Sequence, residues 1–135
     1  MSLTMALVEA HAAGDLHAVE EARQGLAPVK TIDILHSLFR FGQILDRANL
    51  SAEQTAIVEE ELKITADSPE MAVAVATVGR ALLIERSQPA LAMAVNTYGV
   101  PLLNSTSDRV RQMTLILAAV TGAVCRRLKV SFNWR

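Results

Sequence analysis

The chain has few residues that could cross-link or fill a hydrophobic core, apart from small aliphatic ones. Of its 135 residues only one is a cysteine, Cys125, so it cannot form an intrachain disulfide and does not require an oxidising compartment. It has five aromatic residues: three Phe, one Tyr and one Trp. The core must therefore be filled by Ala, Val, Leu, Ile and Met, and such small side chains favour closely packed helices.

A long hydrophobic run is also missing. The longest strongly apolar stretch, Met113 to Cys125, has thirteen residues, whereas a helix that crosses a bilayer needs about 20. The first fifteen residues contain no Lys or Arg, and Glu9 interrupts their apolar run. This is not the pattern of a signal peptide. We therefore expect no membrane span and a cytoplasmic location.

Motifs for catalysis or metal binding are scarce. There is no Gly-rich phosphate loop, no Cys-x-x-Cys and no Gly-x-Ser-x-Gly. The pair Asp33-x-x-His36 stands alone, whereas a di-iron bundle needs two Glu-x-x-His pairs and two more glutamates. The run Glu59 to Glu61 points its carboxylates in different directions around a helix. We predict no catalytic residue, no metal and no cofactor.

Cys125 has two interpretations. It ends a thirteen-residue apolar run, where a cysteine is usually a small core residue. Arg126 and Arg127 follow it, and nearby cations can lower the pKa of a thiol and make it reactive. We favour the core interpretation.

The composition itself predicts a folded chain with uneven charge. Apolar residues make up 51% and charged residues 20% of the sequence, which excludes a disordered chain. Residues 1–70 contain five basic and twelve acidic side chains, while residues 101–135 contain six basic and one acidic. The basic end either meets an anionic partner or attracts the acidic half, within one chain or between copies. We favour the second interpretation.

Helix start and stop signals divide the chain into short helices. Gly14 and Asp15 separate two helices of an N-terminal hairpin, because glycine ends helices and aspartate caps them. Ser51 and Gln54 form a capping box, and Ser68-Pro69 is a further helix start. We predict an all-α fold, a compact bundle of about six helices in one domain, 1–135. Its parts are the hairpin 1–27, the main bundle 31–128 and a short extended tail, 129–135.

Two segments of the bundle resemble each other. Residues 69–83 align without gaps on residues 89–103, and eight of fifteen positions are identical. The agreement reflects either chance between two Ala/Val-rich helices or pseudo-symmetric packing of similar faces. The short link between the segments predicts antiparallel neighbours.

Two predicted helices, 69–85 and 107–128, are apolar on nearly all sides. A helix of this kind must be surrounded by protein or lipid. We therefore predict a homo-oligomer, with a dimer favoured, that self-associates through these helices; the alternative is a compact monomer whose N-terminal helices wrap a central hairpin. The candidate self-association residues are Met71, Val75, Gly79, Leu82, Leu115, Ala118 and Gly122, together with Phe132 and Trp134 of the tail.

The tail combines basic and aromatic residues. Val130, Phe132 and Trp134 alternate with polar residues, which is typical of an extended segment with one apolar face. We interpret it first as a latch that covers apolar helices, then as a hook for a protein partner, and last as a nucleic-acid contact. The candidate anion contacts are Arg109, Arg111, Arg126, Arg127, Lys129 and Arg135.

These patterns predict action by contact. We expect a non-enzymatic interaction or assembly module, such as an adaptor, a chaperone-like protein or a structural subunit. The first alternative is a nucleic-acid-associated regulator that uses the basic C-terminal segment, although nucleic acid is the less favoured partner. The second alternative is a helical enzyme without a recognisable motif.

Overall fold

A computed structural model describes residues 2–46, 51–63, 68–99 and 107–129, and these residues confirm the all-α prediction. They form seven α-helices where about six were predicted, and no strand. The α-helices are α1 (Leu3–Ala13), α2 (Leu16–Leu26), α3 (Thr31–Asp46), α4 (Ala52–Leu62), α5 (Pro69–Arg80), α6 (Gln88–Ala94) and α8 (Ser107–Leu128). Two π-helical segments, η1 (Ala81–Glu85) and η2 (Val95–Gly99), continue α5 and α6.

The predicted helix signals act where the sequence places them. Gly14 ends α1 in the left-handed conformation, with φ at 70°, and the side chain of Asp15 accepts a hydrogen bond of 3.1 Å from the amide of Ala18. Ser51 and Gln54 form both bonds of the capping box before α4. Each of these capping side chains accepts a hydrogen bond from a backbone amide that the helix terminus leaves without a partner.

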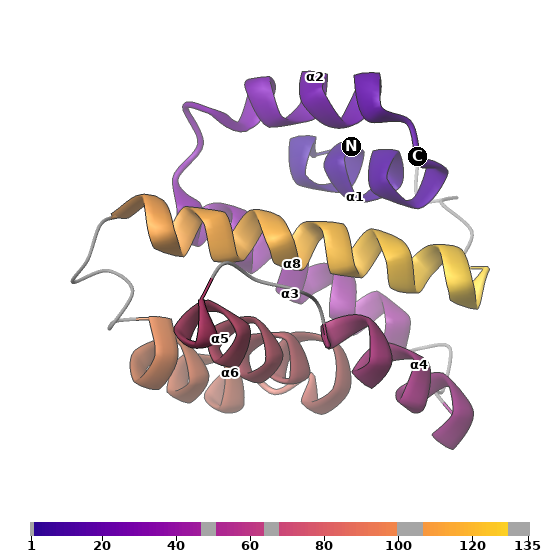
Figure 1. Ribbon diagram of the computed structural model, residues 1–135, viewed down its shortest axis with the longest axis vertical. Coiled ribbons are helices and arrows are strands. Elements are labelled where there is room, and N and C mark those ends of the chain that lie inside the picture. The colour runs from indigo at the N-terminus through magenta and orange to yellow at the C-terminus, as the bar shows by residue number, and fades with distance from the viewer. Residues whose placement is uncertain (1, 47–50, 64–67, 100–106, 130–135) are drawn as a thin grey trace.

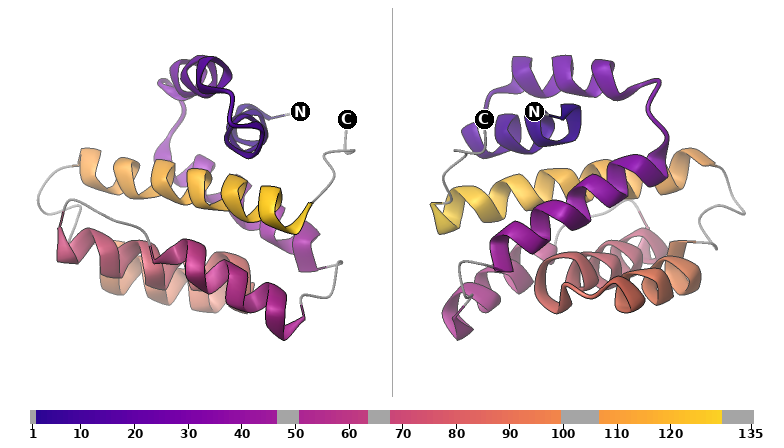
Figure 2. Two further views of the ribbon diagram at one scale, coloured as in Figure 1. Left: turned by 45° about the vertical axis from the view of Figure 1, so that its right-hand side comes forward. Right: turned by 180° about the vertical axis from the view of Figure 1, so that it is seen from behind.

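Helix α8 is the centre of the fold. It lies between α1 on one side and α4 and α5 on the other, with α3 also packed against it (Figure 1). Helix α2 packs on α1 and forms the outer layer, and the turned views in Figure 2 show the same succession. Most of the apolar middle of α8 is therefore enclosed by helices of the same chain.

Most of the predicted self-association residues are buried within one chain, and the self-association itself stays a prediction. Among those in the described part of the chain, which lie in α5, η1 and α8, Leu115 is partly exposed. The buried residues are Met71, Val75, Gly79, Leu82, Ala118 and Gly122. As the protein is folded, these side chains pack against other helices of the chain and present no surface to a partner.

Gly122 is a site of close contact between α8 and α1. A Cβ built at this position would lie 2.5 Å from the Cβ of His11 and 2.8 Å from the backbone oxygen of Val8. A side chain of any size would therefore push α1 away. Gly122 therefore allows a close backbone approach, and the neighbour is α1 of the same chain.

The two similar segments form antiparallel neighbours, as predicted. Helix α5 packs against η2, and α6 packs against η1. Their local geometry is not the same, because the cap Ser68 directly precedes Pro69 whereas the cap Ser87 lies two positions before Pro89. The π-helical segment also begins at different places: η1 follows twelve α-helical residues and η2 follows seven.

Opposite charges of the two halves meet within the chain. Arg80 at the end of α5 lies 2.7 Å from a carboxylate oxygen of Glu59 on α4. Arg127 at the end of α8 lies 3.0 Å from Glu61 and 3.3 Å from Glu60. The acidic run of α4 therefore binds two arginines, Arg80 and Arg127.

Residues 130–135, with Phe132, Trp134 and Arg135, lie outside the described part of the chain, so the tail predictions stay predictions. Among the described helices, none combines the length and the apolar character that crossing a membrane requires.

Candidate functional site

The five predicted anion-contact residues in the described part of the chain do not form one patch. Three of the arginines are already engaged within the chain: Arg109 with Ser68 and Gln112, Arg111 with backbone carbonyls, and Arg127 with carboxylates of α4. Arg111 and Arg127 are sixteen residues apart on α8, roughly 24 Å at 1.5 Å per residue. Arg126 and Lys129 are exposed near the end of α8. The geometry therefore spreads these cations along the helix.

Arg111 ties α8 to the segment between α2 and α3. Its Nη1 donates to the carbonyl oxygen of Val29 at 2.9 Å, and its Nη2 donates to the carbonyl oxygen of Leu26. Nη1 also lies 3.4 Å from the hydroxyl of Thr31. The last carbonyls of a helix lack partners within it and carry partial negative charge, so a guanidinium is a suitable cap.

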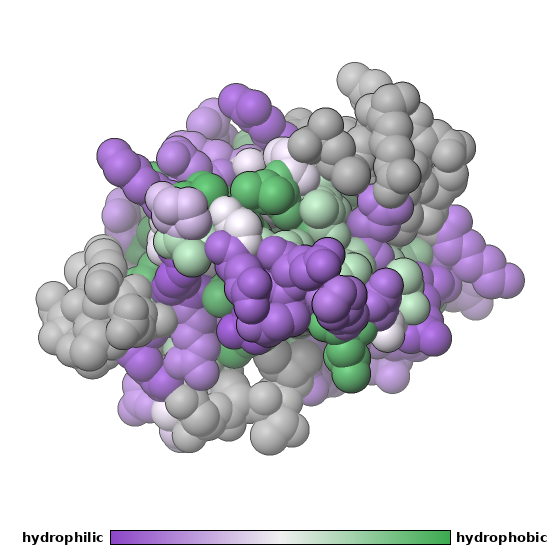
Figure 3. Space-filling view, turned by 90° about the horizontal axis from the view of Figure 1, so that it is seen from above, coloured by the Kyte–Doolittle hydropathy of each residue, from purple (hydrophilic) through white to green (hydrophobic). Residues whose placement is uncertain are grey.

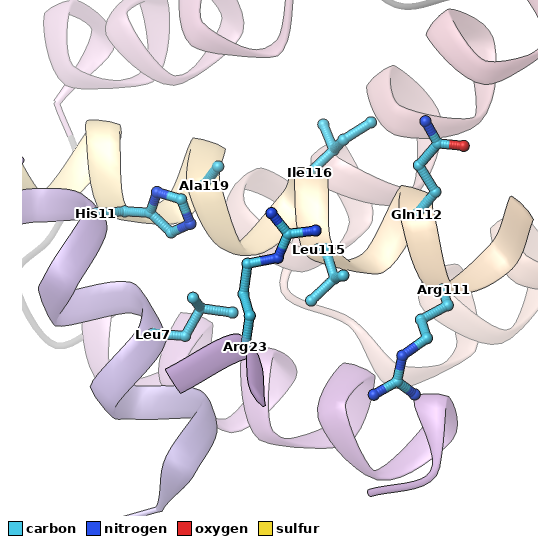
Figure 4. A pocket seen from close by; sticks show the side chains of 8 residues that line it. All are labelled: Leu7, His11, Arg23, Arg111, Gln112, Leu115, Ile116 and Ala119. Carbon is cyan, nitrogen blue, oxygen red and sulfur yellow. The ribbon is translucent and has the colours of Figure 1, made fainter. Parts of the chain in front are cut away.

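We call these Arg111 hydrogen bonds the clamp. A cleft of about 570 Å³ opens beside it, between α1, α2 and α8. Its floor on α8 is apolar, and its rim carries nitrogen atoms from all three helices (Figure 4). The residues that line it are Leu7, His11, Arg23, Arg111, Gln112, Leu115, Ile116 and Ala119. Its volume lies within the range of small-molecule sites.

The charge in the cleft is positive. Arg23 extends from α2 over the apolar floor at Leu115, while His11 lies at the end near Ala119 (Figure 4). Arg23 is exposed and forms no hydrogen bond or ion pair with any residue in the described part. Burial, and then the Arg23 guanidinium, lower the pKa of His11 below its ordinary value of 6.5. Arg23 is therefore the cation that is free to meet a ligand.

A second hollow, of about 250 Å³, lies between α3 and the α6–η2 segment. We call it the α3–α6 groove. Its walls are mainly apolar, with polar side chains at the edges: the lining residues are Ile32, Leu35, His36, Phe39, Gln88, Leu91, Ala92, Val95 and Asn96. Ile32 is 49% exposed, so the groove carries apolar surface that is open to solvent.

The opposite face of the molecule is different in character. Seen from the α2 side, the described surface is mostly hydrophilic and its apolar areas are small and separate (Figure 3). Leu16, 82% exposed, lies at the start of α2. Single exposed apolar side chains of this kind are normal on soluble proteins. The α3–α6 groove is thus the better candidate for an apolar contact.

The chemistry of the remaining candidates is limited. Cys125 is buried at 1% exposure, and burial raises the pKa of its thiol to about 12. The core interpretation is therefore correct, since a thiolate is the reactive form. Within the described ranges no three His, Cys, Asp or Glu side chains converge as a metal site would require.

Sequence reasoning missed the cleft because its residues come from three separate segments. Neither His11 nor Arg23 belongs to a motif that the sequence shows. Only the packing of α2 on α1, which itself packs on α8, brings Arg23 above Leu115. The α3–α6 groove had one readable signal, which is that Ile32 and Phe39 belong to the apolar face of α3.

Comparison of the chain with protein-family models, with curated proteins and with solved structures finds no match. The functional proposal below therefore rests on the geometry of the chain alone.

Proposed function

We propose that the protein acts by contact, as an interaction module that pairs with a second copy through the α3–α6 groove. This replaces the buried faces of α5 and α8 by a surface that the folded chain exposes. An adaptor or a structural subunit would use such a pair to present two identical faces. The proposal is carried by the pattern of exposed side chains on α3.

The residues on the open side of α3, of which Phe39 is partly buried and the others are exposed, are self-complementary. Ile32, His36 and Phe39 follow one another at helical spacing along the groove. Asp33 and Arg40 flank this row at opposite ends, and both side chains are exposed. A two-fold axis near His36 would place two copies of α3 antiparallel.

In that arrangement Ile32 of one copy meets Phe39 of the other, and Asp33 meets Arg40. A two-fold contact makes each of these pairs twice. The charges therefore select the antiparallel register, and the apolar pairs supply most of the attraction.

The pair should be weak. One helix and the edge of a groove bury less than the roughly 1,200 Å² that a stable interface needs, which is the range of transient contacts. We therefore expect a monomer–dimer equilibrium that shifts with concentration between about 1 µM and about 1 mM.

Sedimentation velocity on charge-swapped variants tests the proposal. Asp33→Arg places two cations opposite each other, and Arg40→Asp places two anions opposite each other, so each single variant should stay monomeric where the parent protein dimerises. The double variant restores opposite charges and should dimerise again. This recovery is not expected from a change that merely damages the fold.

Two controls keep the result interpretable. Asp33 lies in the first turn of α3, where an acidic side chain favours the helix, so circular dichroism must show that each variant is folded. Ile32→Asp should abolish pairing, whereas Leu16→Asp on the far face should not. A parent protein that stays monomeric at the highest concentration, or single variants that dimerise as it does, would refute the proposal.

A further inference from the structure

The cleft between α1, α2 and α8 points to a binding function that does not depend on the proposed pairing. We infer that it binds a small amphiphile with one anionic head, of the carboxylate class. The apolar body would lie on α8, and the head would meet Arg23. The inference rests on the shape of the cleft, on its lining and on the state of its two arginines.

The apolar floor is the first observation. Leu115 and Ile116 are only partly buried although they lie in the middle of the central helix, and Ala119 continues the floor by one turn. Leu7 of α1 closes one side. Helix α2 passes over this strip without covering it, so an apolar ligand body would remove the strip from water.

The second observation is the difference between the two arginines. Arg111 donates from its two terminal nitrogens to the carbonyls of Leu26, at the end of α2, and of Val29, just beyond it. Its side chain is therefore part of the wall of the cleft. Arg23 reaches over the floor and bonds to nothing in the described part of the chain. A guanidinium with open donors beside an apolar strip is matched by a planar carboxylate that can accept two parallel hydrogen bonds.

The residues that line the cleft around Arg23 include no acidic side chain. The polar side chains that line the cleft are His11 on α1, Arg23 on α2, and Arg111 and Gln112 on α8. None of them carries negative charge. A bound anion would therefore be the group that offsets the positive rim, and a cationic amphiphile of the same shape would be repelled.

Methyl NMR titrations with eight-carbon amphiphiles test this directly. Octanoate should shift the methyl signals of Leu7, Leu115 and Ile116. Octanol lacks the charge and should bind at least about tenfold more weakly, the usual worth of a charged hydrogen bond. Octylammonium should bind more weakly still. Hexanoate should bind on the order of tenfold more weakly than octanoate, because it buries two fewer methylenes.

Variants separate the head contact from the floor. Arg23→Gln should weaken octanoate at least about tenfold and leave octanol unchanged. Lys63→Gln removes an exposed cation from the end of α4, away from the cleft, and should change neither. Ala119→Leu narrows the floor and should weaken octanoate and octanol together. Thermal unfolding of each variant shows whether it is folded.

Three results would overturn the inference. The first is no shift with octanoate at millimolar concentration. The second is equal affinity for octanoate and octylammonium, which would mean apolar contact without recognition of the head. The third is a response centred on Leu35, Leu91 and Val95, because the ligand would then occupy the α3–α6 groove. None of these outcomes depends on whether the protein pairs, which sedimentation reports separately.

Discussion

Arg111 Nη1 donates a hydrogen bond of 2.9 Å to the carbonyl oxygen of Val29, across 82 positions of sequence. This bond and its neighbour at Leu26 hold the end of α2 and the start of α3 against the central helix. The clamp therefore helps to position both candidate sites, since α2 borders the cleft and α3 forms one wall of the groove.

Removing the clamp should destabilise the fold. Arg111→Met keeps the apolar stem of the side chain but removes the donor to the Val29 carbonyl and leaves the Leu26 carbonyl with only the Val29 amide, at a cost of about 2 kcal/mol. Arg111→Lys should recover only part of the lost stability, because an ammonium lacks the two fixed terminal nitrogens with which a guanidinium reaches both carbonyls. Urea unfolding measures the difference. Arg23→Met is the matched control and should leave stability nearly unchanged; equal losses in the two variants would contradict the account.

The contact at Gly122 makes a second prediction. Gly122→Ala places a methyl group against the backbone of α1, so unfolding free energy should fall by about 1–2 kcal/mol, the overpacking cost less the better helix propensity of alanine. Gly25→Ala on α2 is the counterpart, because its Cβ would meet only the end of the Leu3 side chain at 3.3 Å. That variant should be neutral or more stable. A stabilised Gly122→Ala variant would show that α1 does not pack on α8 as described.

The single thiol reports on the core. Cys125 is buried and the pKa of its thiol is raised to about 12, so an aromatic disulfide reagent at pH about 8 should react far more slowly than with a free thiol. In denaturant one thiol per chain should react at once. Rapid reaction of the folded protein would mean that the end of α8 is open.

Stability should fall on mild acidification. The folded protein lowers the pKa of His11 below 6.5, so below pH 6.5 the unfolded chain takes up a proton that the folded chain resists. Stability is thus fully present above pH 6.5 and declines as the pH falls through that value. Urea midpoints at pH about 7.5 and about 5 should differ less in His11→Gln than in the parent protein. His36→Gln is the control and should keep the parent's difference.

The fold was largely predictable because local signals decide where helices begin and end. Gly14, Asp15, Ser51 and Ser68 act through backbone groups within a few residues, so the sequence alone locates them. Which helix covers α8 was not predictable. Short α1 does so because Gly122 removes a side chain from the contact, and nothing local distinguishes a glycine that meets its own chain from one that meets a second copy.

The candidate sites were predictable to a smaller degree. The apolar row of α3 is visible in the sequence, but its exposed half depends on where α6 stops, and α6 gives way to η2 at Val95. The cleft depends on three segments and on Arg111 being used by backbone carbonyls. Contacts of this kind arise only when the helices pack.

The most direct test of the proposed pairing is a disulfide across its two-fold axis. His36→Cys places a thiol near that axis, where two copies bring like positions close enough to bridge, and buried Cys125 does not compete. Under mild oxidation the variant should become a covalent dimer, whereas Leu16→Cys should not, and adding Asp33→Arg should suppress it. If His36→Cys stays monomeric, or if both cysteine variants cross-link equally, α3 is not the contact between copies.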